Sequence, residues 1–297
     1  MINFRKYPNM TRAVIPSNIT LSTNNFSNAF NNMRNLVTSE FNHPNVNNMS
    51  FTYYNCSNLT GNPVCGNKVT DMYMTYFNCT NLTGSPICGN NVTNMFSTYK
   101  NCHNLIGSPV CGNNVTSMYG TYYGCTNLTG NPVCGNKVTD MSNAYRGCTN
   151  LTGNPICGNN VTDMSNAYYN CKNLSAGDMY VYAPNIINVG NCFWGKNNSR
   201  RYNIHVPANS TTFNTFIINN ASSLVGKTIT YTNNGACWYN TAYNIYIYPI
   251  KSLSEKLIDF NYTENPDGTV TLTSWKGTYN GEPSTKFVIP RDSRIIL

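Results

Sequence analysis

The chain has 297 residues and a formal net charge of +8, yet only 10% of its residues are charged, well below the roughly one quarter that is usual in soluble proteins. The basic residues are scattered, and no run is longer than two, as at Arg200-Arg201. This spread argues against nucleic acid as a partner, because proteins that bind nucleic acid usually present a clustered basic face. It is compatible with attraction to anionic cell-surface polymers. No stretch approaches the ~20 apolar residues of a membrane-spanning helix.

Residues 1–25 precede the repeats as an N-terminal segment. The start, from Met1 to Pro8, lacks the apolar core of about 7–15 residues that a secretory signal contains. We therefore expect a chain that stays in a cytoplasm, leaves it by assembly or lysis, or has already lost a leader. Two interpretations of the segment itself remain open, an anchor or a cap on the repeats.

The centre of the chain is a tandem repeat marked by cysteines. Two series of cysteines each advance in steps of 23 residues. The first series comprises Cys56, Cys79, Cys102, Cys125, Cys148 and Cys171, and the second comprises Cys65, Cys88, Cys111, Cys134 and Cys157. A fixed period of about 20–50 residues is typical of solenoids, whose units stack along one axis. The repeat therefore predicts a solenoid, which we place at residues 26–195.

One unit, residues 138–160, illustrates the expected internal structure. Its apolar side chains recur at the helical spacing i, i+3, i+4 and i+7, as Met141, Ala144, Tyr145 and Cys148. This pattern predicts a short helix, for which Thr139 or Asp140 is a suitable N-cap. Gly153-Asn154-Pro155 ends the helix, and residues 155–157 form a short strand. The predicted fold is an α/β repeat solenoid, similar to leucine-rich repeats, in which each 23-residue unit contains a short helix and a short strand.

The two ends of the chain differ from its centre. Residues 37–48 depart from the repeat pattern, as a capping unit does. Residues 196–250 are predicted to be an α/β cap region at the C-terminal end of the solenoid, with strands at 202–207, 228–232 and 243–249 and a helix at 208–217. Residues 251–297 are predicted to be a small β-rich module. In it the turn signal Asn265-Pro266-Asp267-Gly268 joins strands at 260–262 and 269–273, and a last strand follows at 286–290.

The thirteen cysteines admit two interpretations. An odd number cannot pair completely within one chain, and no CxxC motif suggests a zinc or redox site. In stacked units each series becomes a column of equivalent thiols, and we favour the interpretation that these are small buried side chains. The alternative is a row of disulfides within the units, such as Cys56–Cys65, which needs an oxidising compartment.

Two segments carry a likeness to a known family. Residues 76–83 are Tyr-Phe-Asn-Cys-Thr-Asn-Leu-Thr, and residues 204–209 are Ile-His-Val-Pro-Ala-Asn. They resemble the helix end and the terminal strand unit of BspA-like leucine-rich repeats, although the Pro-Val-Cys-Gly segments here depart from that family's apolar strand ending in proline. The resemblance implies a repeat solenoid. Such repeats occur in bacterial surface proteins that bind host or matrix ligands and in tail-associated proteins of phages and prophages of Firmicutes.

Positions that vary between otherwise copied units are the candidates for ligand binding. The tyrosine three residues before each cysteine of the first series is constant and is predicted to be core. One position later the units carry Tyr54, Phe77, Lys100, Tyr123, Arg146 and Tyr169, and directly after the methionine three units carry Tyr73, Phe96 and Tyr119. Helical geometry points both sets away from the apolar face. We predict an exposed aromatic ladder with interspersed cations, suited to sugars or proteins. The alternative is that these side chains pad neighbouring repeats or a subunit interface.

Catalysis has little support in the sequence. The three histidines, His43, His103 and His205, lie in no HExxH motif and beside no nucleophile motif, and neither a P-loop nor GxSxG occurs. Equivalent acids recur in the repeat at Asp71, Asp140 and Asp163, where we interpret them as N-caps rather than as a calcium ladder. We therefore expect no enzyme activity, no cofactor and no metal site.

The sequence thus favours a noncatalytic structural or binding protein. Our first hypothesis is a phage or prophage tail component, located in the virion, that contacts the host surface. Its partners are then a host surface protein or glycan, other virion proteins and further copies of itself. The runner-up is a BspA-like adhesin on a bacterial cell surface. A third hypothesis is an intracellular phage protein that inhibits a host defence factor.

Overall fold

The computed structural model describes residues 2–41, 43–174, 177–193 and 195, and beyond these the segments 202–207, 210–212, 215, 231–232, 235–236, 238–240, 245–250, 260–264, 270–275, 278–279, 282–283 and 295–296. The chain divides into two compact units, Met1–Pro249 and Ile250–Leu297. In the part of the chain described, no helix has the length and apolar character needed to cross a membrane.

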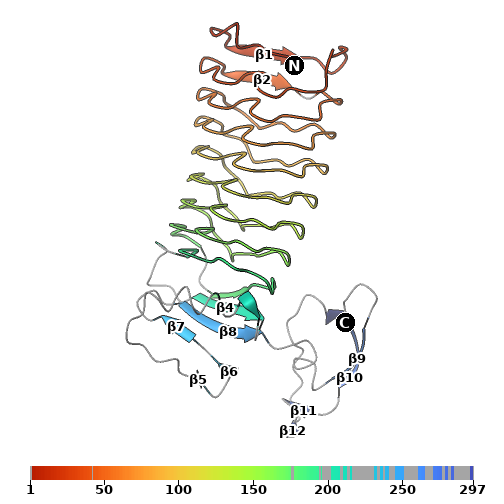
Figure 1. The fold of residues 1–297 in the computed structure, drawn as a ribbon, viewed down its shortest axis with the longest axis vertical. Helices are drawn as coiled ribbons and strands as arrows, with labels where there is room; N and C mark the ends of the chain where they lie inside the picture. Colours follow the sequence, from red (N-terminus) through yellow and green to blue (C-terminus); the bar gives the residue numbers. More distant parts are fainter. Residues whose placement is uncertain are drawn as a thin grey trace. The chain divides into compact units, whose positions relative to one another are not determined.

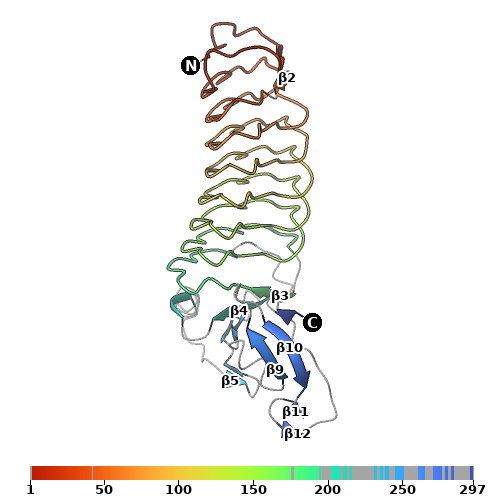
Figure 2. The same cartoon turned by 90° about the vertical axis from the view of Figure 1, so that its right-hand side faces the viewer.

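In the first unit the sequence repeats lie on one another as stacked coils (Figures 1 and 2). Equivalent residues of neighbouring coils join through single parallel bridges, along a line that passes through Asn25, Asn48, Asp71, Asn94, Ser117, Asp140, Asp163 and Asn188. Backbone amides add to these bridges, since Tyr76 N donates to Thr98 O and Tyr99 N to Thr121 O, each at 2.9 Å. One 23-residue unit therefore corresponds to one coil.

The short helix predicted for each unit does not form in the described coils, which contain consecutive turns instead. In the unit of residues 138–160, amides that donate to the next coil alternate with amides that close turns within the coil. The former belong to Met141, Asn143, Tyr145 and Gly147, and the latter to Ala144, Arg146 and Cys148. Asn143 and Gly147 have φ angles of 57° and 77°, and such left-handed residues cannot continue a right-handed helix.

The short strand predicted for each unit is also reduced. In residues 155–157 only Cys157 forms a bridge, to Val181. Longer pairing occurs at the N-terminal end, where β1 (Arg12–Ile15) lies parallel to β2 (Thr38–Phe41). The ring of Phe4 stacks on Phe30 with centroids 4.8 Å apart. Residues of the N-terminal segment thus pack onto the coils, which favours the interpretation of that segment as a cap.

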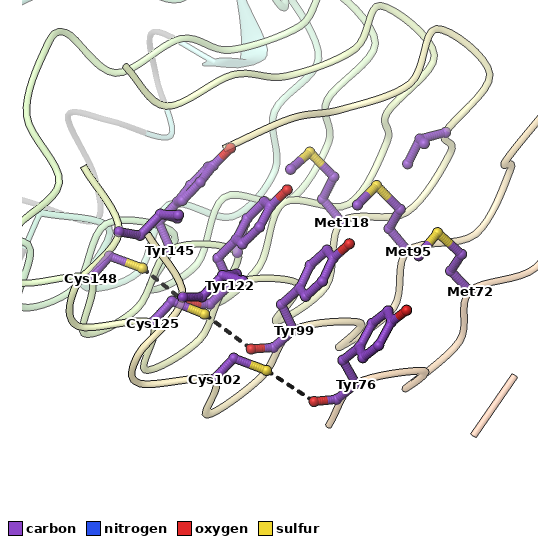
Figure 3. Close-up of a cluster of buried hydrophobic side chains, with 14 of the residues drawn as sticks. Met72, Tyr76, Met95, Tyr99, Cys102, Met118, Tyr122, Cys125, Tyr145 and Cys148 are labelled. Atoms are coloured by element: carbon purple, nitrogen blue, oxygen red, sulfur yellow. Dashed lines mark hydrogen bonds between the residues drawn. The ribbon is translucent and has the colours of Figure 1, made fainter. Parts of the chain in front are cut away.

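A column of tyrosines fills the middle of the core (Figure 3). Tyr53, Tyr76, Tyr99, Tyr122, Tyr145 and Tyr168 are each at most 1% exposed, and neighbouring rings stack with centroids 5.2–5.6 Å apart. The hydroxyl of Tyr99 donates to Ile87 O at 2.8 Å and accepts from Ile87 N at 3.1 Å. The prediction that these tyrosines are core is confirmed, and their polar ends are satisfied by hydrogen bonds.

The C-terminal part of the first unit contains a four-stranded sheet with the order β3-β4-β8-β7. Its strands are β3 (Gly177–Tyr180), β4 (Tyr202–Pro207), β7 (Trp238–Asn240) and β8 (Ile245–Ile250). β3 and β4 are parallel, β7 and β8 are antiparallel, and β5 (Tyr231–Thr232) pairs with β6 (Gly235–Ala236). The strand predicted at 202–207 is confirmed. Of the helix predicted at 208–217, residues 211, 212 and 215 are helical.

The second unit is described through its strands. β9 (Phe260–Glu264) and β10 (Val270–Trp275) are antiparallel, and β13 (Ile295–Ile296) lies parallel to β10. β11 (Thr278–Tyr279) pairs with β12 (Glu282–Pro283). The predicted pairing of the strands at 260–262 and 269–273 is confirmed. The turn at 265–268 and the strand predicted at 286–290 lie outside the described residues.

Candidate functional site

Six side chains from successive coils form one continuous column at the surface of the stack. This mixed column comprises Tyr54, Phe77, Lys100, Tyr123, Arg146 and Tyr169. The rings of Tyr54 and Phe77 stack with centroids 4.8 Å apart. Because the coils repeat with the sequence period, residues 23 positions apart occupy the same place on neighbouring coils. The column therefore follows from the repeat length.

Both cations of the mixed column lie over aromatic rings. Lys100 Nζ is 5.5 Å from the ring centroid of Phe77 and 4.6 Å from that of Tyr123. Arg146 Cζ is 5.4 Å from the centroid of Tyr123 and 4.6 Å from that of Tyr169. Such cation–π contacts contribute about 0.5–1 kcal/mol each at exposed sites. Tyr123 also separates the two cations, so the column alternates charge and ring.

A second column, the ring column, comprises Tyr73, Phe96 and Tyr119. Tyr73 and Phe96 stack with centroids 4.9 Å apart, and Phe96 and Tyr119 with centroids 4.5 Å apart. The next position in this column is Ser142, which carries no ring and is 6% exposed. The stacked rings therefore end at Tyr119.

All nine predicted site residues are half-buried rather than fully exposed. Neighbouring members of each column cover one another's ring faces, so the ring edges are what the surface presents. The side chains thus pad one another along the stack, as the alternative interpretation expected, and still contribute to the surface. Their part in ligand binding remains a prediction.

Phe51 also belongs to this surface, although it is not among the nine predicted site residues. Its ring lies 5.7 Å from that of Tyr54 and 5.1 Å from that of Tyr73, centroid to centroid. It therefore connects the mixed column to the ring column. Its sequence signal is an aromatic residue at a position that varies between units. The signal is weak because the equivalent positions of the next units carry Met74, Ser97 and Gly120, none of which is aromatic.

The acidic repeat positions act at turns rather than at helices. The Oδ1 atom of Asp140 accepts hydrogen bonds from the amide of Ser142 at 2.8 Å and from its hydroxyl at 2.5 Å. Asp71 and Asp163 accept from the amides of Tyr73 and Ser165 in the same way. The expected bond to an early backbone N–H is present, but it closes a turn because no helix follows in these coils.

The histidines show no catalytic arrangement in the part of the chain that the structure describes. His43 is 2% exposed, and its Nε2 lies 2.9 Å from Ile19 O. His103 is exposed, and its Nδ1 lies 2.8 Å from Gly124 O. Across the described ranges, no three His, Cys, Asp or Glu side chains are grouped in a way that could hold a metal ion.

The two cysteine series occupy different environments, and every described cysteine is a free thiol. In the first series each Sγ donates to the carbonyl of the core aromatic residue one coil back, as Cys102 does to Tyr76 O at 3.0 Å (Figure 3). In the second series Cys65, Cys88, Cys111 and Cys134 are half-buried. Burial raises the pKa of Cys65 to about 11 and that of Cys111 to about 12. The disulfide suggested as an alternative, Cys56–Cys65, is absent, since both residues are free thiols. Cys56 donates instead to Phe30 O and Cys65 to Gly66 O.

Comparison of the chain with models of protein families, with characterised proteins and with solved structures gives no match. The resemblance to BspA-like repeats and the leucine-rich-repeat class therefore remain predictions. The candidate site is accordingly argued from its own geometry.

Proposed function

We propose that this protein is a noncatalytic binding component of a phage or prophage tail, where its stacked coils contact the surface of the host cell. The observation that carries the proposal is the pair of surface columns, which run across successive coils and contain side chains that differ between units. Core positions such as the tyrosines are constant, because stacking requires them. Variable side chains at the surface, beside a column of constant core tyrosines, are typical of a ligand-facing surface on a constant scaffold.

The chemistry of the surface supports binding rather than catalysis. Aromatic edges and stacked cations supply apolar area together with hydrogen-bond donors, which is the composition of protein interaction surfaces. A stack held by repeated hydrogen bonds keeps these groups at fixed distances, so little side-chain entropy is lost on binding. The tail setting is supported by the resemblance of the repeats to those of phage tail-associated proteins.

The first experiment is mass spectrometry of purified virions from the organism that carries the gene. Detection at a constant ratio to a known tail protein is the expected result. Absence from particles, with the protein in the host cytoplasm or on its cell wall, would contradict the tail assignment.

A second experiment tests the surface itself. Replacing Tyr73, Phe96 and Tyr119 with Ser should reduce adsorption of the purified protein to host cells at least several-fold, because the apolar edges of the ring column are removed. A matched control replaces Thr93, Thr116 and Thr139, exposed residues in another column, with Ser. Unchanged adsorption of the folded ring-column variant would show that the ring column is not part of the binding surface.

A further inference from the structure

We propose that Lys100 and Arg146 form an anion-binding site in the mixed column, and that its ligand is a linear polymer carrying phosphodiester groups. This inference rests on the proposed function, since it names the chemistry of the ligand that the same surface contacts. It goes further by assigning the contact to two residues that the geometry distinguishes from the other cations of the coils.

The first argument is that these two charges are uncompensated. Within the described ranges the one ion pair joins Arg12 to Glu40, near the N-terminal end of the coils. The acids in the coils around Arg146 are occupied in turns, Asp140 with Ser142 and Asp163 with Ser165. Lys100 and Arg146 therefore lie on aromatic rings with no carboxylate partner among the described residues, which leaves their charge available to an external anion.

The second argument is that stacking orients the donors. The guanidinium of Arg146 lies over Tyr123 and over Tyr169, so rings flank it from the coils on either side. Its N–H groups lie in the guanidinium plane, and among the described residues its one hydrogen bond is a long one, from Nη1 to Asn143 Oδ1 at 3.4 Å. The remaining donors keep the planar fork that binds phosphate in a bidentate manner, and the rings restrict its rotation before the ligand arrives.

The third argument is spacing. Lys100 and Arg146 are two repeat lengths apart, 46 residues, which corresponds to roughly 9–10 Å if coils are spaced like neighbouring strands at about 4.8 Å. Tyr123 lies between them and contacts both cations. A linear polymer aligned with the stack can therefore place one phosphate at Lys100 and a later one at Arg146, with the C–H groups between them against the edge of Tyr123.

The same geometry argues against a nucleic acid as the polymer. Proteins that bind single strands stack the bases on free aromatic faces. Here the faces of Phe77 and Tyr123 are covered by Tyr54, Lys100 and Arg146, so bases have no platform. A polymer without flat rings does not need a free aromatic face, so the covered rings do not weaken its binding.

The test measures binding of the full chain to poly(glycerol phosphate) by calorimetry, with neutral dextran, polygalacturonate and a single-stranded oligonucleotide as comparison polymers. The variant K100Q/R146Q should bind poly(glycerol phosphate) at least tenfold more weakly than the unaltered chain. The matched control is K68Q/K137Q, which removes the same charge from exposed lysines that bond to Asn45 and Asn114 elsewhere on the coils. It should change Kd less than twofold.

Two further measurements sharpen the result. Arg146→Lys keeps the charge but removes the planar fork, so a several-fold weaker affinity is expected even if the double variant proves unstable. The slope of log Kd against log salt should fall by about 1.4 in K100Q/R146Q, at about 0.7 for each phosphate that the variant no longer neutralises. The proposal is overturned if both double variants bind equally weakly, which indicates diffuse charge, or if polygalacturonate or the oligonucleotide binds more tightly than poly(glycerol phosphate).

The experiments distinguish an error in the anion-binding site from an error in the proposed function. If K100Q/R146Q adsorbs to host cells as well as the unaltered chain does, the anion site is wrong and the binding surface lies elsewhere. If the unaltered chain is absent from virions and does not adsorb to cells, the proposed function is wrong, whatever its affinity for the polymer.

Discussion

At the scale of single residues, the core of the stack combines apolar packing with polar groups that are satisfied by backbone. The buried tyrosines exemplify this, because each ring packs between rings while its hydroxyl is hydrogen-bonded, as that of Tyr122 is to Val110, 12 positions earlier. The buried threonines behave similarly, since the hydroxyl of Thr98 donates to Met72 O at 2.8 Å. Buried polar atoms are therefore paired throughout the described side chains, as the cost of leaving them unpaired requires.

Removing one core hydroxyl should therefore destabilise the stack. In Tyr99→Phe the N–H and C=O of Ile87 lose their shared partner, and we expect the free energy of unfolding to fall by about 1–3 kcal/mol. Tyr53→Phe is the matched control and should cost less, because the hydroxyl of Tyr53 bonds to the side chain of Ser39 instead of to backbone. Urea denaturation of both variants measures the difference. Equal stability of Tyr99→Phe and the unaltered chain would contradict the role of the hydroxyl.

The thiols make stability depend on pH. Burial raises the pKa of Cys65, Cys111 and Cys134 from 9.0 to about 11, 12 and 11. Above pH 9 the unfolded chain loses thiol protons while the folded chain keeps them, so the unfolded state is favoured as pH rises. The stability from these protonated thiols is complete below pH 9 and is lost as pH approaches the folded pKa values. Denaturation curves from pH 7 to 11 should show this fall.

A cysteine variant separates the thiols from other titrating groups. Replacing Cys65, Cys88, Cys111 and Cys134 with Ala should weaken the decrease in stability above pH 9, while the buried tyrosines, whose pKa values burial also raises, retain part of it. An identical pH dependence in this variant would show that these four thiols make no contribution.

At the scale of the structural element, the repeat unit is a series of turns stabilised by its neighbours. Left-handed residues recur directly before the cysteines of the first series and before Met33, as Asn32, Asn55, Asn78, Asn101, Gly124, Gly147 and Asn170. Asn and Gly tolerate this conformation best. The asparagines also bond to one another, since Asn78 Nδ2 donates to Asn55 Oδ1 and Asn101 Nδ2 to Asn78 Oδ1, each at 2.8 Å. The turn and the stack therefore depend on the same residues.

Substitution at this position should reveal the cost of the left-handed turn. A Cβ on Gly147 meets nothing closer than 3.7 Å, so Gly147→Ala isolates the backbone strain, and we expect a decrease in stability of about 1–2 kcal/mol. Gly124→Ala should cost more, because its Cβ lies 2.7 Å from Asn101 Oδ1. Gly147→Asn restores the residue found in other units and should cost less than Gly147→Ala. The reverse order of stabilities in chemical denaturation would refute this account.

At the scale of the whole stack, each coil packs against the coils beside it. The stacked rings illustrate this, since Tyr122 meets Tyr99 on one side and Tyr145 on the other. Stability in such arrays is approximately a sum of unit and interface terms, so interior coils gain from two neighbours. The cap formed by Phe4 and β1 supplies the second neighbour at the N-terminal end.

Amide hydrogen exchange should reveal this difference in stability between interior and terminal coils. The amide of Tyr99 donates to Thr121 O within the array, and we expect it to exchange at least tenfold more slowly than that of Phe4, which donates to Ala29 O at the N-terminal end. Local opening begins where packing is sparsest. Hydrogen exchange followed by mass spectrometry of the intact chain measures both regions, and uniform protection along the coils would indicate a single cooperative unit instead.

Much of the scaffold was predictable from the amino-acid sequence, because its period has a direct physical meaning. Hydrogen bonds between coils require equivalent residues to stand opposite each other, so the 23-residue step determined the register, the columns and the identity of the core. Met141, Tyr145 and Cys148 were correctly assigned to the core from their spacing alone. The nine candidate site residues were chosen by variation between copied units, and they are half-buried rather than exposed.

Only the tertiary structure decided how each unit folds and what its surface presents. The apolar spacing i, i+3, i+4 is shared by a helix and by consecutive turns, and the Asn or Gly before each cysteine distinguishes them only once left-handed φ angles are seen. Exposure of the aromatic columns could not be predicted either, because a ring such as Phe96 is covered by residues 23 positions away on both sides. Local sequence specifies which side chains are available, and the stacking of coils determines which of their faces remain free.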